Sequence, residues 1–174
     1  MMIKVVVIPA DETRPLRLER MDAADLDGFQ RLVGGLIQAV GLSEPDATVF
    51  VNEEGKNLGL PANPRATALA WLHNEALRGW DVLAGDAVIT GPPDDDGRVT
   101  DTPRLLATFL LDAPVVRAQA MRASGEWTDI SDPAGDPFIA YQHALRVATA
   151  SEEAIQVRVV PDGTGQIADP GSGT

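Results

Sequence analysis

The stretch 47–65, which reads ATVFVNEEGKNLGLPANPR, constrains the fold more than any other part of the sequence. It opens with β-branched and aromatic residues, which favour strands, and this run ends at the polar Asn52. Two glycines follow, and glycine permits the positive φ angles that tight turns require. Asn63 then precedes Pro64, which is the usual order of an N-cap and the first residue of a helix. The stretch therefore predicts a strand, two turns and the start of a helix.

Apolar patterns predict strands and helices along the rest of the chain. Residues 3–9 (IKVVVIP) form a β-branched run, which is typical of a buried strand. Leu26, Phe29 and Val33 recur at helical spacing, and two glycines end that pattern. The predicted strands are 3–9, 15–19, 36–42, 47–52, 81–91 (bent at Gly85 and regular at 87–90), 114–122 and 155–159. The predicted helices are 23–34 with Asp22 as its cap, 64–78 ended by Gly79, one opened by Thr102 and Pro103, and one opened by Asp136 and Pro137.

These elements predict an α+β fold with two parts. Residues 1–112 should form a mixed or mainly antiparallel sheet with two or three helices, with 3–9 and 15–19 paired as one hairpin and 36–42 and 47–52 as another. Residues 113–161 should form a small strand–helix–strand module. Because so short a segment buries little apolar surface alone, we expect it to dock on the first part. Residues 162–174 are rich in Pro, Gly, Ser and Thr, which predicts a disordered tail.

The chain is strongly acidic, with 26 acidic against 14 basic residues and a formal net charge of −12. Such a surface repels the phosphates of nucleic acids, so we expect no direct binding to DNA or RNA. The acidic side chains are spread along the sequence, with short clusters only at 53–54, 94–96 and 152–153. This distribution favours a surface that keeps the protein in solution. The alternative is a surface that imitates DNA and occupies a DNA-binding protein.

The sequence contains no cysteine, which excludes disulfides and thiolate metal sites and favours an intracellular protein. No apolar run approaches the length of a membrane span, and the run 3–9 is too short for the core of a signal peptide. We therefore expect a cytoplasmic protein with no membrane-spanning segment.

The sequence lacks the common catalytic patterns. Its two histidines, His73 and His143, fall in separate predicted helices and are expected at the surface or at its boundary. The order of glycine and lysine in 55–59 (GKNLG) differs from a P-loop, in which lysine follows the second glycine. The acidic run 94–96 lacks the ligand spacing of an EF-hand. We therefore predict no catalytic residues, no cofactor and no metal.

Binding residues are most plausibly placed in the loops that follow the strand 47–52, because loops held on a rigid sheet often carry binding side chains. Lys56 and Arg65 are expected to pair with Glu53 or Glu54 and so fix these loops; the alternative is that they contact a ligand or partner. The three tryptophans, at 71, 80 and 127, are expected in the core or at its boundary, and an exposed one would indicate an interface. The candidate binding residues are Asn52, Glu53, Glu54, Lys56, Asn63 and Arg65.

The same stretch carries a family resemblance. The motifs NEEGK at 52–56, LGLP at 58–61 and RAT at 65–67, with Asn63 between them, resemble a small domain family from actinobacterial, plasmid and phage genomes. The resemblance spans roughly residues 1–101, and the family carries only the label of a domain of unknown function. It implies no catalytic residues. The occurrence of the family on mobile elements implies accessory work, such as interference with host defence, replication or regulation.

We therefore hypothesise a non-enzymatic accessory protein of a phage, plasmid or integrated element that acts by binding a macromolecular partner. The expected partner is a protein, and the candidates are a host defence protein or a DNA-binding protein. The alternative hypothesis is a small-ligand-binding protein or enzyme that uses the loops of residues 52–65. The oligomeric state is left open by the sequence.

Overall fold

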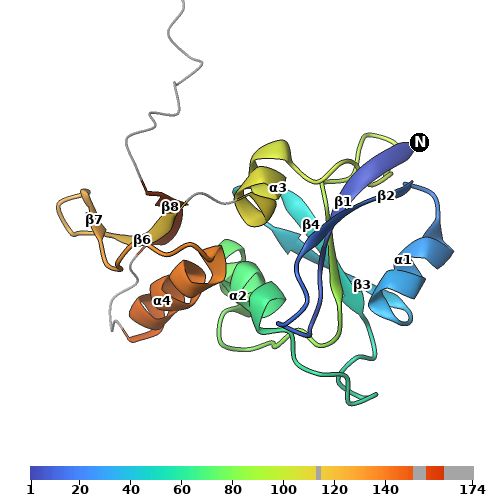
Figure 1. Cartoon of the computed structure of the whole chain (residues 1–174), viewed down its shortest axis with the longest axis horizontal. Helices are drawn as coiled ribbons and strands as arrows, with labels where there is room; N and C mark the ends of the chain where they lie inside the picture. The colour runs from blue at the N-terminus through green and yellow to red at the C-terminus, as the bar shows by residue number, and fades with distance from the viewer. Residues whose placement is uncertain (113–114, 151–155, 163–174) are drawn as a thin grey trace, which may run out of the picture.

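The computed structural model describes residues 1–112, 115–150 and 156–162. Within these ranges the chain forms four α-helices and two antiparallel sheets, one of five strands and one of three (Figure 1). The predicted α+β class is confirmed. The predicted tail lies almost entirely outside the described residues, and so do the residues at 113–114 where the two parts were expected to meet.

The five-stranded sheet is built from two hairpins joined by a central strand. Each neighbouring pair of strands is antiparallel, and both predicted hairpins are present. The central strand comes later in the sequence and pairs with one strand of each hairpin. The order across the sheet is β2 (Arg17–Asp22), β1 (Met2–Ile8), β5 (Ala87–Thr90), β4 (Ala47–Asn52) and β3 (Ile37–Leu42).

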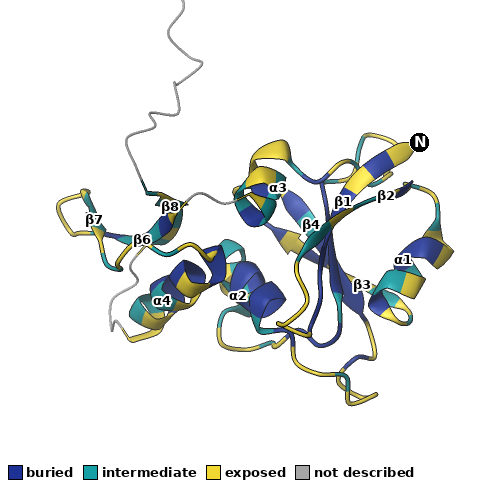
Figure 2. Ribbon diagram, in the orientation of Figure 1, coloured by how far each residue is buried: buried dark blue, intermediate teal, exposed yellow. Residues whose placement is uncertain are grey.

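Both faces of this sheet are covered by helices, as Figures 1 and 2 show. On one face Val5, Val7 and Val88 pack with Phe29 and other residues around α1 (Leu26–Val33). On the opposite face the alternate strand residues pack against α2 (Pro64–His73) and α3 (Arg104–Leu111). Because side chains of a strand alternate between the two faces, a strand covered on both sides needs apolar residues at nearly every position. This explains the apolar run 5–8 of β1, all of which is buried.

The predicted start of α1 and the predicted extent of the strand 81–91 are wrong, and each has a local cause. Asp25 rather than Asp22 caps α1: its carboxylate accepts from the Gly28 N–H at 2.9 Å, while Asp22 accepts from the N-terminal amine at 3.2 Å. The predicted strand 81–91 is regular only in β5. Gly85, at φ +81°, interrupts it, and the segment before it makes only an isolated bridge from Ala84 to Ala62.

The helix α2 ends at His73 instead of continuing to residue 78. Asn74 leaves the helical conformation with φ −147° and ψ 94°, and its side chain donates to the Gly41 carbonyl in β3 at 2.9 Å. A short 3-10 helix, η1 (Glu75–Leu77), follows, and Gly79 adopts a positive φ only after it. The hydrogen bond from Asn74 to β3 therefore forms where the sequence pattern predicts a further turn of α2.

The C-terminal segment forms the second sheet, in the order β7 (Trp127–Asp129), β6 (Val116–Met121) and β8 (Val157–Pro161), and a helix, α4 (Pro137–Ala150). The strand β7 is an addition to the predicted strand–helix–strand pattern. Figure 1 shows α4 beside α2, and Phe138, Tyr141 and Leu145 of α4 join the same apolar cluster as α2 and the large sheet. The division into residues 1–112 and 113–161 remains a prediction.

Among the described residues, no helix has both the length and the apolar character that crossing a bilayer requires.

Candidate functional site

Asn63 is fully buried at the point where three segments meet. Its Oδ1 accepts from the Ala66 N–H at 3.0 Å, which confirms its predicted role as the cap of α2. Its Nδ2 donates to the carbonyls of Ile8 at 2.9 Å and Gly85 at 3.0 Å. One side chain thus joins the start of α2 to the end of β1 and to the segment before β5. The amide is occupied by the fold and is closed to a ligand.

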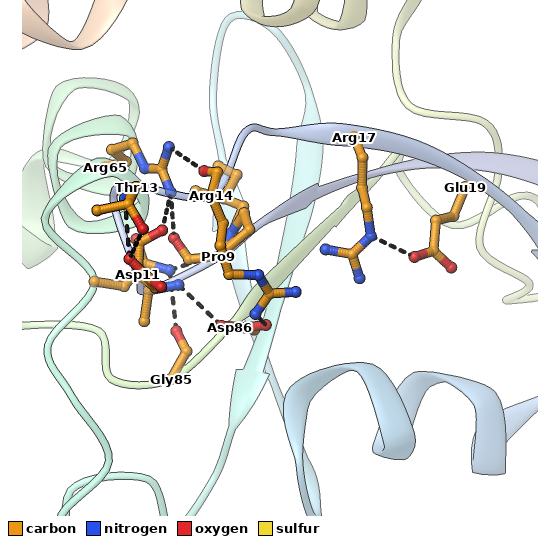
Figure 3. Close-up of polar contacts among 12 residues, drawn as sticks. Pro9, Asp11, Thr13, Arg14, Arg17, Glu19, Arg65, Gly85 and Asp86 are labelled. Carbon is orange, nitrogen blue, oxygen red and sulfur yellow. Dashed lines mark hydrogen bonds and ion pairs between the residues drawn. The ribbon is translucent and has the colours of Figure 1, made fainter.

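Arg65, in the first turn of α2, is also buried, with 7% exposure. Figure 3 shows its guanidinium group among the carbonyls of the loop between β1 and β2. Nη2 donates to Pro9 at 2.6 Å and to Asp11 at 3.0 Å, and Nη1 donates to Arg14 at 3.1 Å. The expected pairing of Arg65 with Glu53 or Glu54 is wrong, because the helix directs this side chain toward the opposite loop.

The same loop is held from its other side by Asp86, which precedes β5. Its Oδ1 accepts from the Ala10 N–H at 2.9 Å, and its Oδ2 lies 3.6 Å from Arg14 (Figure 3). The hydroxyl and backbone N–H of Thr13 donate to Asp11 and lower the pKa of that carboxyl group. The loop between β1 and β2 is therefore fixed by polar contacts along its length.

Asn52 holds the C-terminal end of α1. Its Nδ2 donates to the carbonyl of Gly34 at 2.9 Å, at the C-terminal end of α1, and its Oδ1 accepts from the Glu54 N–H at 2.9 Å. A Cβ at Gly35 would lie 2.6 Å from Asn52 Nδ2, so this position requires glycine. Like Asn63, Asn52 holds the fold together.

Glu53, Glu54 and Lys56 are exposed. Lys56 forms an ion pair with Asp81 rather than with either glutamate, so this expected pairing is also wrong. The Lys56–Asp81 pair joins loop 53–62 to loop 78–86. Between these loops lies a hollow of only about 50 Å³, lined in part by Glu53 and Lys56. Small-molecule sites usually measure roughly 300–1,000 Å³, so the six candidate residues do not form a pocket of that kind.

The most exposed aromatic side chain of the described residues lies in loop 78–86. Trp80 is 88% exposed, and Val82 beside it is 44% exposed. Loop 78–86 is held by the indole of Trp71, whose Nε1 donates to the Asp81 carbonyl at 2.7 Å. Leu58, on the joined loop 53–62, is 60% exposed. We call Trp80 and Val82 the Trp80 surface; the expectation that Trp80 is a core or boundary residue is wrong.

A larger cleft lies between the end of α2 and the second sheet. Its volume is about 740 Å³. One wall comes from the turn after β3, the end of α2 and η1, and the other from β7 and β8. Its walls include Ser43, Glu44, Leu72, His73, Arg78, Trp127, Val157 and Arg158. Sequence reasoning missed this cleft because its residues come from segments spread over more than a hundred positions and carry no common motif.

His73 lines this cleft and contacts the C-terminal segment. Its Nε2 is 3.1 Å from the hydroxyl of Tyr141 in α4. Burial lowers the pKa of His73 below its ordinary value of 6.5, although its contacts with the backbone of Glu44 and Ser43 act in the opposite direction. Burial also raises the pKa of the Tyr141 hydroxyl. Both groups are therefore neutral at pH 7.

We predict that acidification destabilises the protein through His73. In the range just below pH 6.5 the folded protein binds fewer protons at His73 than the unfolded chain does, so the free energy of unfolding should fall as the pH falls. Urea unfolding at pH 7.5 and 5.5 measures this change. The variant His73→Gln should show a shallower dependence over the same range, and an unchanged dependence would contradict the assignment. The pKa values of the Asp11 and Asp129 carboxyl groups are also lowered. These groups affect the free energy of unfolding only near and below their ordinary pKa of 3.8.

A second groove, of about 390 Å³, runs between α2 and α4. It is lined mainly by apolar groups, among them Trp71, Val82 and Leu145. The described residues contain no cluster of three or more His, Cys, Asp or Glu side chains placed to hold a metal ion.

The fold and these surfaces define an α+β domain with a polar, closed junction around α2 and an exposed tryptophan beside it. Residues 3–112 match the family model described as "Domain of unknown function (DUF3846)". The chain therefore belongs to the DUF3846 family. Neither the curated proteins nor the solved structures contain a match to the sequence.

Proposed function

We propose that the protein is a non-enzymatic accessory protein of a phage, plasmid or integrated element, and that it acts by binding a protein partner at the Trp80 surface. The observation that carries this proposal is the exposure of Trp80, at 88%, on a loop that is anchored at the neighbouring Asp81. Tryptophan is enriched among the residues that dominate binding energy at protein interfaces, because its large ring buries much apolar area and loses little conformational entropy.

The anchoring of the loop supports the proposal. Trp71 holds the Asp81 carbonyl, and Lys56 pairs with the Asp81 carboxylate. Because these contacts order the loop before any partner arrives, binding costs less conformational entropy. An exposed apolar side chain on an ordered loop is available to a partner, whereas one on a disordered segment must first be fixed.

The charges near this surface indicate the chemistry of the partner. Glu53 and Glu54 lie exposed on the joined loop, and Glu75 lies exposed on η1 before it. With the net charge of −12, these groups favour a partner whose contact surface is basic, as the surfaces of DNA-binding proteins are. Charge of this kind raises the rate of association, while the tryptophan supplies most of the affinity.

The variant Trp80→Ala tests the proposal. Partners captured by the immobilised wild-type protein from a lysate of a host of the element, and then purified, should bind the variant at least about 30-fold more weakly, since a central interface tryptophan contributes roughly 2 kcal/mol or more. Binding is measured by titration at two salt concentrations, and higher salt should slow association.

The matched control is Leu105→Ala, which removes an apolar side chain that is 76% exposed on α3. This variant should bind as the wild type does. Equal binding by wild type and Trp80→Ala, or the absence of any specifically captured protein, would contradict the proposal.

A further inference from the structure

The cleft between α2 and the second sheet has the size and lining of a small-molecule site, and it is separate from the Trp80 surface. Its volume of about 740 Å³ lies in the usual range for such sites, roughly 300–1,000 Å³. Leu72 on one wall and Trp127 on the other supply apolar surface. Arg78 and Arg158 supply one guanidinium group from each wall.

Both guanidinium groups are oriented by neutral acceptors. The Nε of Arg78 donates to the Trp71 carbonyl at 3.1 Å. The Nε of Arg158 donates to the side-chain oxygen of Gln119 at 2.9 Å, and its guanidinium carbon lies 4.0 Å from the centre of the Trp127 ring. Because each arginine is held through Nε, its terminal nitrogens remain the donors for another group.

The described residues do not neutralise these two charges closely. Arg158 has no carboxylate within 4.0 Å among the residues that the structure describes. Arg78 lies 3.8 Å from Glu75, whose side chain is 81% exposed. By comparison, Arg17 lies 2.6 Å from its carboxylate partner. In a chain with almost twice as many acidic as basic residues, two arginines held by neutral groups in one cleft are available for an external anion.

We propose that this cleft binds a small organic anion. The terminal nitrogens of Arg78 and Arg158 bind one phosphate or carboxylate group, which a guanidinium fork recognises well. The apolar part of the ligand lies against Leu72 and Trp127. Glu44 and Glu75 also border the cleft and disfavour a ligand with several negative groups. The ligand therefore carries a single anionic group on an apolar body.

Titration of the full chain with phenyl phosphate, benzoate and benzyl alcohol tests the proposal. The NMR signals of the arginine Nε–H groups report the binding. At least one of the two anions should shift the signals of Arg78 and Arg158. The anion that binds more tightly identifies the preferred anionic group. Benzyl alcohol lacks the charge and should shift neither. Inorganic phosphate lacks the apolar part and should bind more weakly than phenyl phosphate.

The variants Arg78→Gln and Arg158→Gln should each weaken binding of the preferred anion about tenfold or more, because each removes a charge-assisted hydrogen bond. The matched control Arg98→Gln, in the exposed loop after β5, should bind normally. If Arg78→Gln does not fold, Arg158→Gln alone decides. Absence of binding by both anions, or an equal loss in Arg98→Gln, would overturn the proposal. Trp80→Ala should leave this binding intact, which separates it from the proposed protein interaction.

Discussion

Replacing Asn63 with alanine should lower the free energy of unfolding by about 3 kcal/mol. The substitution removes the cap of α2, which contributes roughly 0.5–2 kcal/mol in comparable helices. It also leaves the carbonyls of Ile8 and Gly85 without their side-chain donor. A buried polar group that loses its partner costs about 1–3 kcal/mol. Because Asn63 has no exposed surface, water cannot readily replace the amide. Urea unfolding followed by circular dichroism measures the effect.

The variant Asn57→Ala is the matched control, since it makes the same substitution at an exposed position of the same loop region. Its free energy of unfolding should stay within about 0.5 kcal/mol of the wild-type value. If Asn63→Ala also stays within that range, the buried amide does not join β1, α2 and the segment before β5 as the structure indicates.

Local patterns predicted much of the sheet and the start of α2. The two strands of each hairpin, β1 with β2 and β3 with β4, lie close together in sequence, so the residues that define each hairpin are visible in one short segment. The Asn63–Pro64 pair identifies the helix start for the same reason, because a cap acts only on the next three residues. In each case the determining contacts are local.

The features that sequence reasoning missed depend on distant contacts. Arg65 resembles an exposed charge in the sequence, but its three acceptors lie more than fifty positions earlier. The early end of α2 depends on the bond from Asn74 to Gly41, and the Arg78–Arg158 cleft depends on the placement of the second sheet. A motif gives the residue types but not the carbonyl groups that will surround them.

The charged and amide residues of the family signature suggest a binding site, but half of them stabilise the fold. Asn52, Asn63 and Arg65 carry the polar atoms that hold turns and helix ends to the sheet, and all three are buried. Of the six candidate binding residues, only Glu53, Glu54 and Lys56 are exposed. The signature marks a polar junction of the fold, and the exposed Trp80, which lies outside the signature, marks the surface proposed to bind a partner.

Replacing Arg65 with methionine should lower the free energy of unfolding by about 2 kcal/mol or more. Methionine retains an apolar stem of similar length but donates no hydrogen bonds, so the carbonyls of Pro9, Asp11 and Arg14 lose their donors. Asp11 and Arg14 are exposed, and water can satisfy their carbonyls; Pro9 is buried, and its carbonyl remains without the charged donor. Hydrogen bonds from charged groups contribute roughly 1.5–3 kcal/mol each when buried. Urea unfolding measures the loss.

Arg31→Met provides the contrast. Arg31 has a carboxylate partner, Asp25, at 3.4 Å, whereas the contacts of Arg65 are all to neutral carbonyls. The Arg31 side chain is 71% exposed, however, and exposed ion pairs contribute at most about 1 kcal/mol. Burial and hydrogen-bond geometry, rather than the presence of an opposite charge, should therefore decide which arginine stabilises the fold. A loss for Arg31→Met equal to that for Arg65→Met would show that this ranking is wrong.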